Sequence, residues 1–143
     1  MSHLLEKKVQ DVAINEFLAL TAGDILFIDS SQVAKTGSDV MYLFLEMLPL
    51  LRPGVLVHIH DVFLPSDYAK EWVLNRNRSW NEEYLLHALL IHPARYRVLF
   101  GSANAAQCHG EKVVKAPARA DDHGMSGGGF WIEVVAKLPE IKF

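Results

Sequence analysis

Two short runs of apolar residues, each closed by a carboxylate, stand out along the chain. Residues 24–29 read Asp-Ile-Leu-Phe-Ile-Asp, and residues 55–61 read Val-Leu-Val-His-Ile-His-Asp. A short apolar run without polar alternation is typical of a strand that is buried on both faces of a parallel sheet. Both segments are therefore predicted to be buried parallel strands, and the first to be a central one.

A helical pattern fills the segment between these two strands. Ser38 is a suitable N-cap, and Asp39 in the first turn interacts favourably with the helix dipole. Apolar residues recur at steps of three and four and define one face of this helix: Val40, Leu43, Phe44, Met47, Leu48 and Leu51. A strand, a helix and a strand in this order predict a parallel crossover, with the helix covering the sheet.

The rest of the chain predicts the further elements of an α/β domain. A helix is predicted over residues 14–20, and a capping box at residues 79–82 marks the start of another. Strands are predicted over residues 96–100 and 130–135. The polar, glycine-bearing segment 109–129 shows no periodicity and is predicted to be a long loop.

Composition narrows the class of protein. The 143 residues have the length of one domain, and 50% hydrophobic content is enough for an ordinary core. A net charge of −3 without blocks of like charge disfavours a nucleic-acid surface. The single cysteine, Cys108, excludes an intrachain disulfide, and residues 1–30 lack the pattern of a secretory signal. No apolar stretch reaches the roughly 20 residues of a membrane span, so we expect a cytoplasmic protein without a membrane partner.

Two acids occupy the positions where ligands bind in open α/β sheets. Asp29 and Asp61 each follow a predicted parallel strand at its carboxyl end. Two carboxylates converging there can hold a hard cation such as Mg²⁺ or orient hydroxyl groups of a ligand. Alternatively, each acid caps its own loop through backbone N–H groups, and the sequence leaves both interpretations open.

The chain holds seven histidines, of which His58 and His60 share one face of the second predicted strand. We disfavour a metal site here, because a third nitrogen or thiolate ligand at recognisable spacing is absent. His58 is expected to pack under a helix, whereas His60 stays of interest beside Asp61. Trp72 and Trp80 flank a polar segment that forms either a lid over the strand ends or a loop pinned by the two rings.

The order of these motifs resembles one enzyme family. Residues 24–31 (DILFIDSS), 35–39 (KTGSD), 51–65 (LRPGVLVHIHDVFLP) and 128–131 (GGFW) together resemble class I S-adenosylmethionine-dependent methyltransferases, nearest to the macrocin-type sugar O-methyltransferases. The family sheet has the strand order 3-2-1-4-5-7-6. The resemblance implies that residues 1–143 form a single partial domain with a Rossmann-like sheet of strands four to seven. It also implies that the glycine-rich half that cradles the cofactor is not encoded here.

The resemblance places four residues in the family site, and a fifth, His60, is a separate hypothesis. Asp29 and Asp61 match two acids that bind Mg²⁺ in metal-dependent members, and Asp29 with Ser30 would lie beside the S-adenosylmethionine. Gln32 occupies the position where macrocin-type enzymes place a histidine base and catechol-type enzymes a lysine. An amide has no usable basicity near neutral pH. His60 is then the alternative catalytic base.

Two functions follow as expectations. The first is O-methyl transfer from S-adenosylmethionine to a hydroxyl of a small molecule, with or without the assistance of a metal ion. The second is a non-catalytic, methyltransferase-like oligomeric module. Without strands one to three, the strand at residues 24–29 is an edge with bare N–H and C=O groups. We therefore expect a homo-oligomer, a complementing N-terminal half, or cover by the helix at residues 14–20.

Overall fold

The two apolar runs form neighbouring parallel strands, as predicted from the sequence. The prediction that the first is central and buried on both faces is wrong, because this strand lies at the edge of the described sheet and Ile25 and Phe27 are 54% and 59% exposed. The computed structural model of the chain describes residues 4–91, 94–114 and 128–137, with only the backbone of 111–114. In it, β1 (Ile25–Ile28) pairs in parallel with β2 (Leu56–Ile59). These strands carry Asp29 and Asp61 to the same edge of the sheet, because the carboxyl ends of parallel strands coincide.

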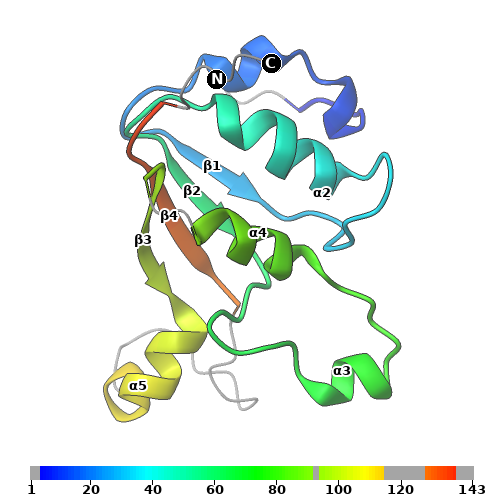
Figure 1. Ribbon diagram of the computed structural model, residues 1–143, viewed down its shortest axis with the longest axis vertical. Coiled ribbons are helices and arrows are strands. Elements are labelled where there is room, and N and C mark those ends of the chain that lie inside the picture. The colour runs from blue at the N-terminus through cyan, green and yellow to red at the C-terminus, as the bar shows by residue number, and fades with distance from the viewer. Residues whose placement is uncertain (1–3, 92–93, 115–127, 138–143) are drawn as a thin grey trace.

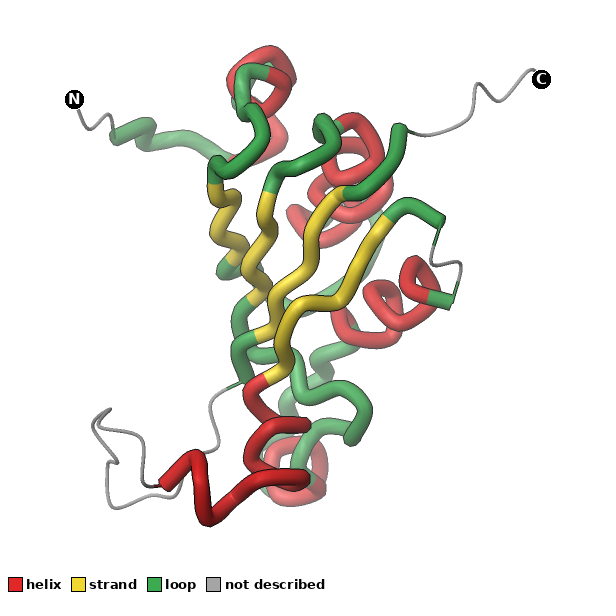
Figure 2. The backbone as a smooth tube through the Cα atoms, turned by 90° about the vertical axis from the view of Figure 1, so that its left-hand side faces the viewer, coloured by secondary structure: helices red, strands yellow, loops and turns green. Residues whose placement is uncertain are grey.

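Within the described residues, the sheet has four strands in the order β1-β2-β4-β3. The last strand, β4 (Phe130–Val134), lies between β2 and β3 (Tyr96–Gly101) and is antiparallel to both. The fold is therefore α/β with a mixed open sheet and flanking helices, an arrangement compatible with a partial Rossmann-like fold (Figures 1 and 2).

The predicted crossover helix joins β1 to β2. It consists of α2 (Asp39–Met41), a π-helical stretch η2 (Tyr42–Met47) and a final 3₁₀ turn η3 (Leu48–Leu50). The Ser38 hydroxyl accepts a hydrogen bond from the amide of Met41 at 3.3 Å, which confirms the predicted N-cap. All six residues of the predicted apolar face are buried, since this face covers the sheet.

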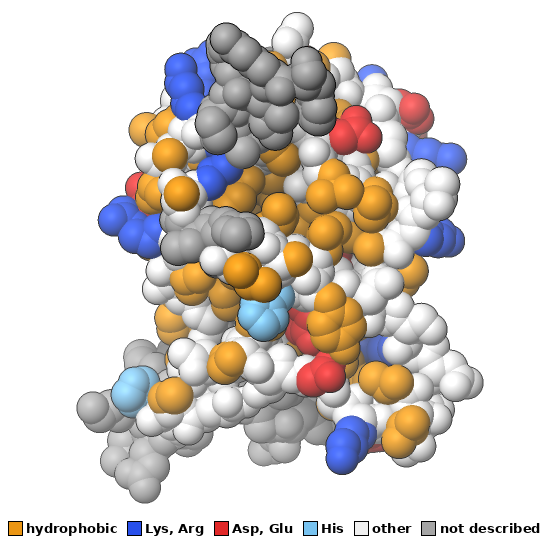
Figure 3. All heavy atoms as spheres, in the orientation of Figure 1, with side chains coloured by type: hydrophobic (Ala, Val, Ile, Leu, Met, Phe, Trp, Pro, Cys, Tyr) orange, Lys and Arg blue, Asp and Glu red, His pale blue; other side chains and the backbone are white. Residues whose placement is uncertain are grey.

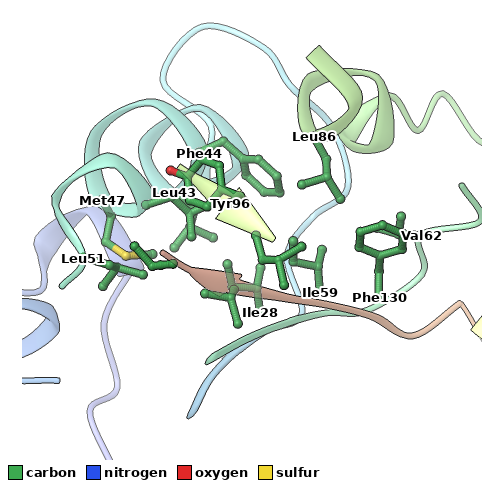
Figure 4. Packing of buried hydrophobic residues seen from close by; sticks show 14 of the residues in the cluster. Ile28, Leu43, Phe44, Met47, Leu51, Ile59, Val62, Leu86, Tyr96 and Phe130 are labelled. Carbon is green, nitrogen blue, oxygen red and sulfur yellow. The ribbon is translucent and has the colours of Figure 1, made fainter. Parts of the chain in front are cut away.

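The core lies between this helix, α4 (Glu82–Leu90) and one face of the sheet. Figure 4 shows Phe44 and Met47 on the helical side of the core and Ile28 and Ile59 on the side of the sheet. Leu86 joins them from α4 and is fully buried. Burial of each such side chain stabilises the fold by roughly 1.5–3 kcal/mol.

Arg95 fastens the end of the crossover helix to the start of β3. Its guanidinium donates hydrogen bonds to the carbonyl oxygens of Leu48, Pro49 and Leu51 at 3.3, 2.6 and 3.0 Å, and also to that of Ala136. Carbonyl groups at the end of a helix lack intrahelical partners, and the buried arginine supplies donors for them. The side chain is only 7% exposed.

The remaining helical elements of the described residues are η1 (Val9–Asp11), α1 (Ile14–Leu18), α3 (Lys70–Leu74) and α5 (Ser102–Val114). The first α-helix confirms a helix in the predicted segment. The prediction of a loop from residue 109 is wrong as far as residue 114, because α5 continues to that point with a kink at His109; residues 115–127 lie outside the described part. Among the described helices, none has the length and hydropathy required for crossing a membrane.

The two faces of the sheet differ in their cover. Figure 3 shows the side that carries α2 and α4, where hydrophobic side chains gather in the middle and most basic side chains lie at the rim. No described helix covers the opposite face of the sheet, which we call the open face. Its row of opposed residues, Phe27, His58, Trp131 and Phe100, runs across all four strands. Phe27 and Phe100 are 59% and 50% exposed, which is unusual for aromatic side chains of a sheet.

Candidate functional site

The loop after β1 holds three of the predicted site residues and docks onto the start of α4. Asp29 is exposed and accepts one hydrogen bond, from the side-chain amide of Gln32 at 3.3 Å. Gln32 is 9% exposed and has a φ of 54°, in the left-handed region. Its carbonyl oxygen accepts the amide N–H groups of Asn81 and Glu82 at 3.0 and 3.3 Å. The buried glutamine therefore orients Asp29 and satisfies the first turn of α4.

Ser30 binds a residue that sequence reasoning did not assign to the site. Its hydroxyl donates to the Glu82 carboxylate, which is 1% exposed and whose Oε1 has no hydrogen-bond partner among the described residues. Burial raises the pKa of Glu82 to about 7; the Ser30 hydrogen bond lowers it, and the charges of Asp39, Asp29 and Asp61 raise it further. Glu82 is thus the buried acid of this edge.

The predicted capping box at residues 79–82 is wrong. Helix α4 has Asn81 as its N-cap, so Glu82 is the first helical residue and its carboxylate reaches Ser30 instead of the helix backbone. The Asn81 side chain binds the backbone of Ala34, accepting its N–H at 2.6 Å and donating to its carbonyl at 3.3 Å. No local signal reveals this role, because acids in a first helical turn ordinarily serve the helix dipole.

Glu83 ties the loop after β2 to the same helix. It is 0% exposed; its Oε2 accepts the amide of Phe63 at 3.0 Å, and its own amide donates to the Tyr68 hydroxyl at 3.3 Å. Burial raises the pKa of this carboxyl above its usual range. The loops that follow both parallel strands are therefore fixed by consecutive glutamates of α4.

His60 and Asp61 form a pair at the carboxyl end of β2. The Nδ1 atom of His60 lies 3.2 Å from Oδ1 of Asp61, and the two side chains are 46% and 24% exposed. A carboxylate this close to Nδ1 favours the proton on that nitrogen, which leaves Nε2 as a proton acceptor. Asp61 has a φ of 57°, so this turn holds a non-glycine residue in the left-handed region at a predicted site.

Gly128 allows this turn to form. A Cβ atom at this position would lie 2.7 Å from the Cα of Asp61 and 2.9 Å from the nitrogen of Val62. The Gly128 carbonyl also accepts the amide of Val62 at 2.8 Å. The close approach of the two backbones requires a residue without a side chain.

His58 lies on the open face of the sheet, so the prediction that it packs under a helix is wrong. Its ring stacks on Phe27 with centroids 4.6 Å apart and contacts Trp131 at 4.7 Å. The side chain is 8% exposed, and its Nδ1 has no hydrogen-bond partner among the described residues. Burial lowers its pKa, and the neighbouring His60 lowers it further. His58 is thus held as a neutral ring in an aromatic stack.

The segment between Trp72 and Trp80 is pinned by its own arginine. The Arg78 guanidinium lies 4.5 Å from the Trp72 ring centroid and 4.3 Å from that of Trp80. The two rings contact each other edge to face at 5.4 Å. These contacts favour the interpretation of a pinned loop over that of a lid.

The described residues of this edge contain no preformed cluster of metal ligands. No group of three or more His, Cys, Asp or Glu side chains within residues 4–91, 94–110 and 128–137 is arranged to hold a metal ion. Asp61 lies beside His60, and Asp29 accepts an amide N–H of Gln32, and neither contact uses the full acceptor capacity of its carboxylate. Magnesium at Asp29 and Asp61 stays a prediction from the resemblance.

Comparison with known proteins does not assign the chain to a family. No protein-family model, no curated protein and no solved structure matches it. The function of the chain is therefore inferred from the residues at the carboxyl edge of β1 and β2.

Proposed function

We propose that this chain acts in S-adenosylmethionine-dependent transfer of a methyl group to a hydroxyl of a small molecule. The observation that carries the proposal is the contact between His60 and Asp61 at the end of β2. Asp29 stands at the end of the neighbouring parallel strand, so a base and an exposed carboxylate lie at the same edge of the sheet.

The strand order supports the proposal. The observed order β1-β2-β4-β3 is the order 4-5-7-6 that the sequence resemblance implies for the second half of the methyltransferase sheet. In both, the last strand of the chain lies between its two predecessors. A general α/β domain has no need of this insertion, because consecutive strands more often lie side by side.

His60 would act as general base. When bound, S-adenosylmethionine supplies the methyl group on its sulfonium and leaves as S-adenosylhomocysteine. Nε2 of His60 takes the proton of the acceptor hydroxyl, while Asp61 holds the ring through Nδ1 and stabilises the imidazolium. Gln32 cannot take this proton, and we assign it the role of orienting Asp29.

Asp29 is the residue that fits one side of the cofactor. Its exposed carboxylate accepts a single hydrogen bond and keeps capacity for a ligand or for a nearby positive charge. The Ser30 hydroxyl donates its hydrogen bond to Glu82, so it can only accept a hydrogen bond from a cofactor. A second copy of the chain or a complementing N-terminal half would supply the glycine-rich side of the site. We give Mg²⁺ no step in this reaction.

Calorimetric titration with S-adenosylhomocysteine tests the proposal. We expect binding at low micromolar concentration, weakened about 10-fold or more in Asp29→Asn, because a hydrogen bond to a charged group is worth roughly 1.5–3 kcal/mol. Asp11→Asn, an exposed acid in η1, is the matched control and should bind like the wild type. Millimolar binding or none by the wild-type chain would contradict the proposal.

Turnover tests the base. In a screen of hydroxyl acceptors that records release of S-adenosylhomocysteine, His60→Ala should abolish methyl transfer. His87→Ala, which removes an exposed imidazole from α4, should retain it. Unchanged turnover in His60→Ala would remove His60 from the mechanism.

A second candidate is a non-catalytic oligomeric module with the same sheet. The observation that favours it is Gln32, an amide at the position where the family resemblance places a base, together with the open face beside β1. The calorimetric titration separates the two candidates, since a module without catalysis has no need to bind the cofactor product.

A further inference from the structure

The outer edge of β1 has unused hydrogen-bonding groups. The amides of Leu56 and His60 donate to the carbonyl oxygens of Asp24 and Ile28, each at 2.9 Å. Because successive residues of a strand direct their backbone groups to opposite sides, Ile25 and Phe27 direct theirs away from β2. No described residue bonds to the backbone of either one. Figure 2 shows β1 at one border of the sheet, with no described helix or strand outside it.

This edge lacks the features that normally keep edge strands apart. Its sequence is Ile-Leu-Phe-Ile, without charge, proline or bulge, and Ile25 and Phe27 are 54% and 59% exposed. The opposite edge, β3, has both a charged residue and an irregular pairing. It carries Arg97, and its pairing with β4 is shifted between Val98 and Phe100. Only the β3 edge is therefore protected against pairing with another strand.

We infer that β1 pairs antiparallel with β1 of a second copy of this chain. The hydrogen-bonding pattern restricts the register, because residues with outward backbone groups must face each other. Full overlap, with Ile25 opposite Ile28 of the second copy, would set an outward residue against an inward one. It would also set Asp24 opposite Asp29 of the second copy, where two like charges repel. This register is excluded on both grounds.

The favoured register pairs Ile25 with Phe27 of the second copy, and Phe27 with its Ile25. A twofold axis then passes between the two Leu26 residues. All four exposed apolar side chains of the two strands form cross-strand pairs on the open face. The alternative with Phe27 opposite Phe27 would set Ile25 against Asp29 and keep one apolar pair on the open face instead of two, so this register is disfavoured.

The pairing has a consequence for the candidate site. It joins two four-stranded sheets into one and brings Gly23 of the second copy beside Asp29. A short strand pair buries less than the roughly 1,200–2,000 Å² of a stable interface, so the association is reversible and of micromolar strength. The inference does not depend on methyl transfer, because self-association is measured without any cofactor.

Disulfide trapping with three single-cysteine variants tests the register. The variants Ile25→Cys, Leu26→Cys and Phe27→Cys are made with Cys108→Ser, which removes the exposed native thiol. Opposed residues of a non-hydrogen-bonded antiparallel pair have Cα atoms about 4.5 Å apart, within disulfide range. We expect Leu26→Cys alone to form a disulfide-linked dimer. Preferential cross-linking of Ile25→Cys or Phe27→Cys would overturn the register.

Sedimentation of the unmodified chain tests the association itself. Between about 1 and 200 µM, the wild type should shift from monomer to dimer. Phe27→Lys should raise the Kd at least about 10-fold, because both Ile25–Phe27 pairs are lost. Leu74→Lys places the same charge on a residue that is 74% exposed in α3 and should dimerise normally. A wild-type monomer throughout this range, or equal dimerisation of both lysine variants, would overturn the inference.

Discussion

Replacement of Glu82 by glutamine should make the protein more stable at alkaline pH and change it little in acid. The pKa of Glu82 is raised from its ordinary value of 4.5 to about 7, chiefly by burial. Between these values the unfolded chain has lost the proton while the folded chain still binds it. The free energy of unfolding therefore falls as pH rises from 4.5 to about 7 and is constant above that range.

The size of the effect follows from the same two values. The interval from 4.5 to about 7, at about 1.4 kcal/mol per pH unit, corresponds to a loss of about 3 kcal/mol in the free energy of unfolding. About 2 kcal/mol of this loss falls between pH 5 and pH 8. Glu82→Gln retains an oxygen that can accept the Ser30 hydrogen bond and has no charge to desolvate. The advantage of the variant over the wild type should grow by about 2 kcal/mol over that range.

Urea denaturation followed by circular dichroism at pH 5, 6, 7 and 8 measures this growth. The difference between variant and wild type is the useful quantity, because Glu83 and His58 also have shifted pKa values and contribute to both curves. Glu46→Gln, at an exposed position of η2, is the matched control. A difference for Glu82→Gln that stays constant within about 0.5 kcal/mol across the series would refute the buried, protonated glutamate.

Three further substitutions test the frame around the site by the same denaturation assay. Gly128→Ala should lower the free energy of unfolding by about 1–3 kcal/mol, because its Cβ would lie 2.7 Å from the backbone of the turn after β2. Gly110→Ala is the control, since its Cβ would meet nothing within 4 Å, and it should leave the stability unchanged. Arg95→Met should lower the free energy of unfolding by about 3 kcal/mol or more, because it removes the donor of several buried carbonyl groups. Arg52→Met, at an exposed arginine, is the control, and an equally small loss in both variants would contradict this role of Arg95. His58→Phe should stabilise the protein more at pH 5 than at pH 8. The pKa of His58 is lowered from its ordinary value of 6.5, so the wild type loses stability as the pH falls below 6.5. An equal effect at both pH values would show that the pKa of His58 is not lowered.

Local periodicity predicted the main elements well. The apolar face of the crossover helix, from Val40 to Leu51, is buried throughout, and both parallel strands lie where their apolar runs predicted them. These features depend on neighbouring residues only, so the sequence shows them directly. Segment 109–114 was predicted wrongly because α5 has a polar composition and includes Gly110, so its helical pattern is weak.

The site depended on contacts that local patterns do not contain. Ser30 and Glu82 are 52 positions apart, so the sequence assigned Glu82 to a local cap instead of a tertiary hydrogen bond. His58 was expected under a helix because β2 reads as buried on both faces. In the structure its burial comes from Phe27 and Trp131 on strands that lie on either side of β2. Such neighbours are known only when the strand order is known.

The position of β4 affects how the protein folds during synthesis. β4 is the last described strand in the sequence, but it lies in the interior of the sheet. It pairs with β2 on one side and β3 on the other, so these two strands are not joined before β4 is in place. Its pairing with β2 joins Ile59 to Phe130, so the sheet closes only through contacts between distant residues. Such contacts form slowly. On the ribosome, the emerging chain would therefore expose the inner edges of β2 and β3 until residues 130–134 have left the exit tunnel. During this period the two unpaired strand edges are a defined target for chaperones.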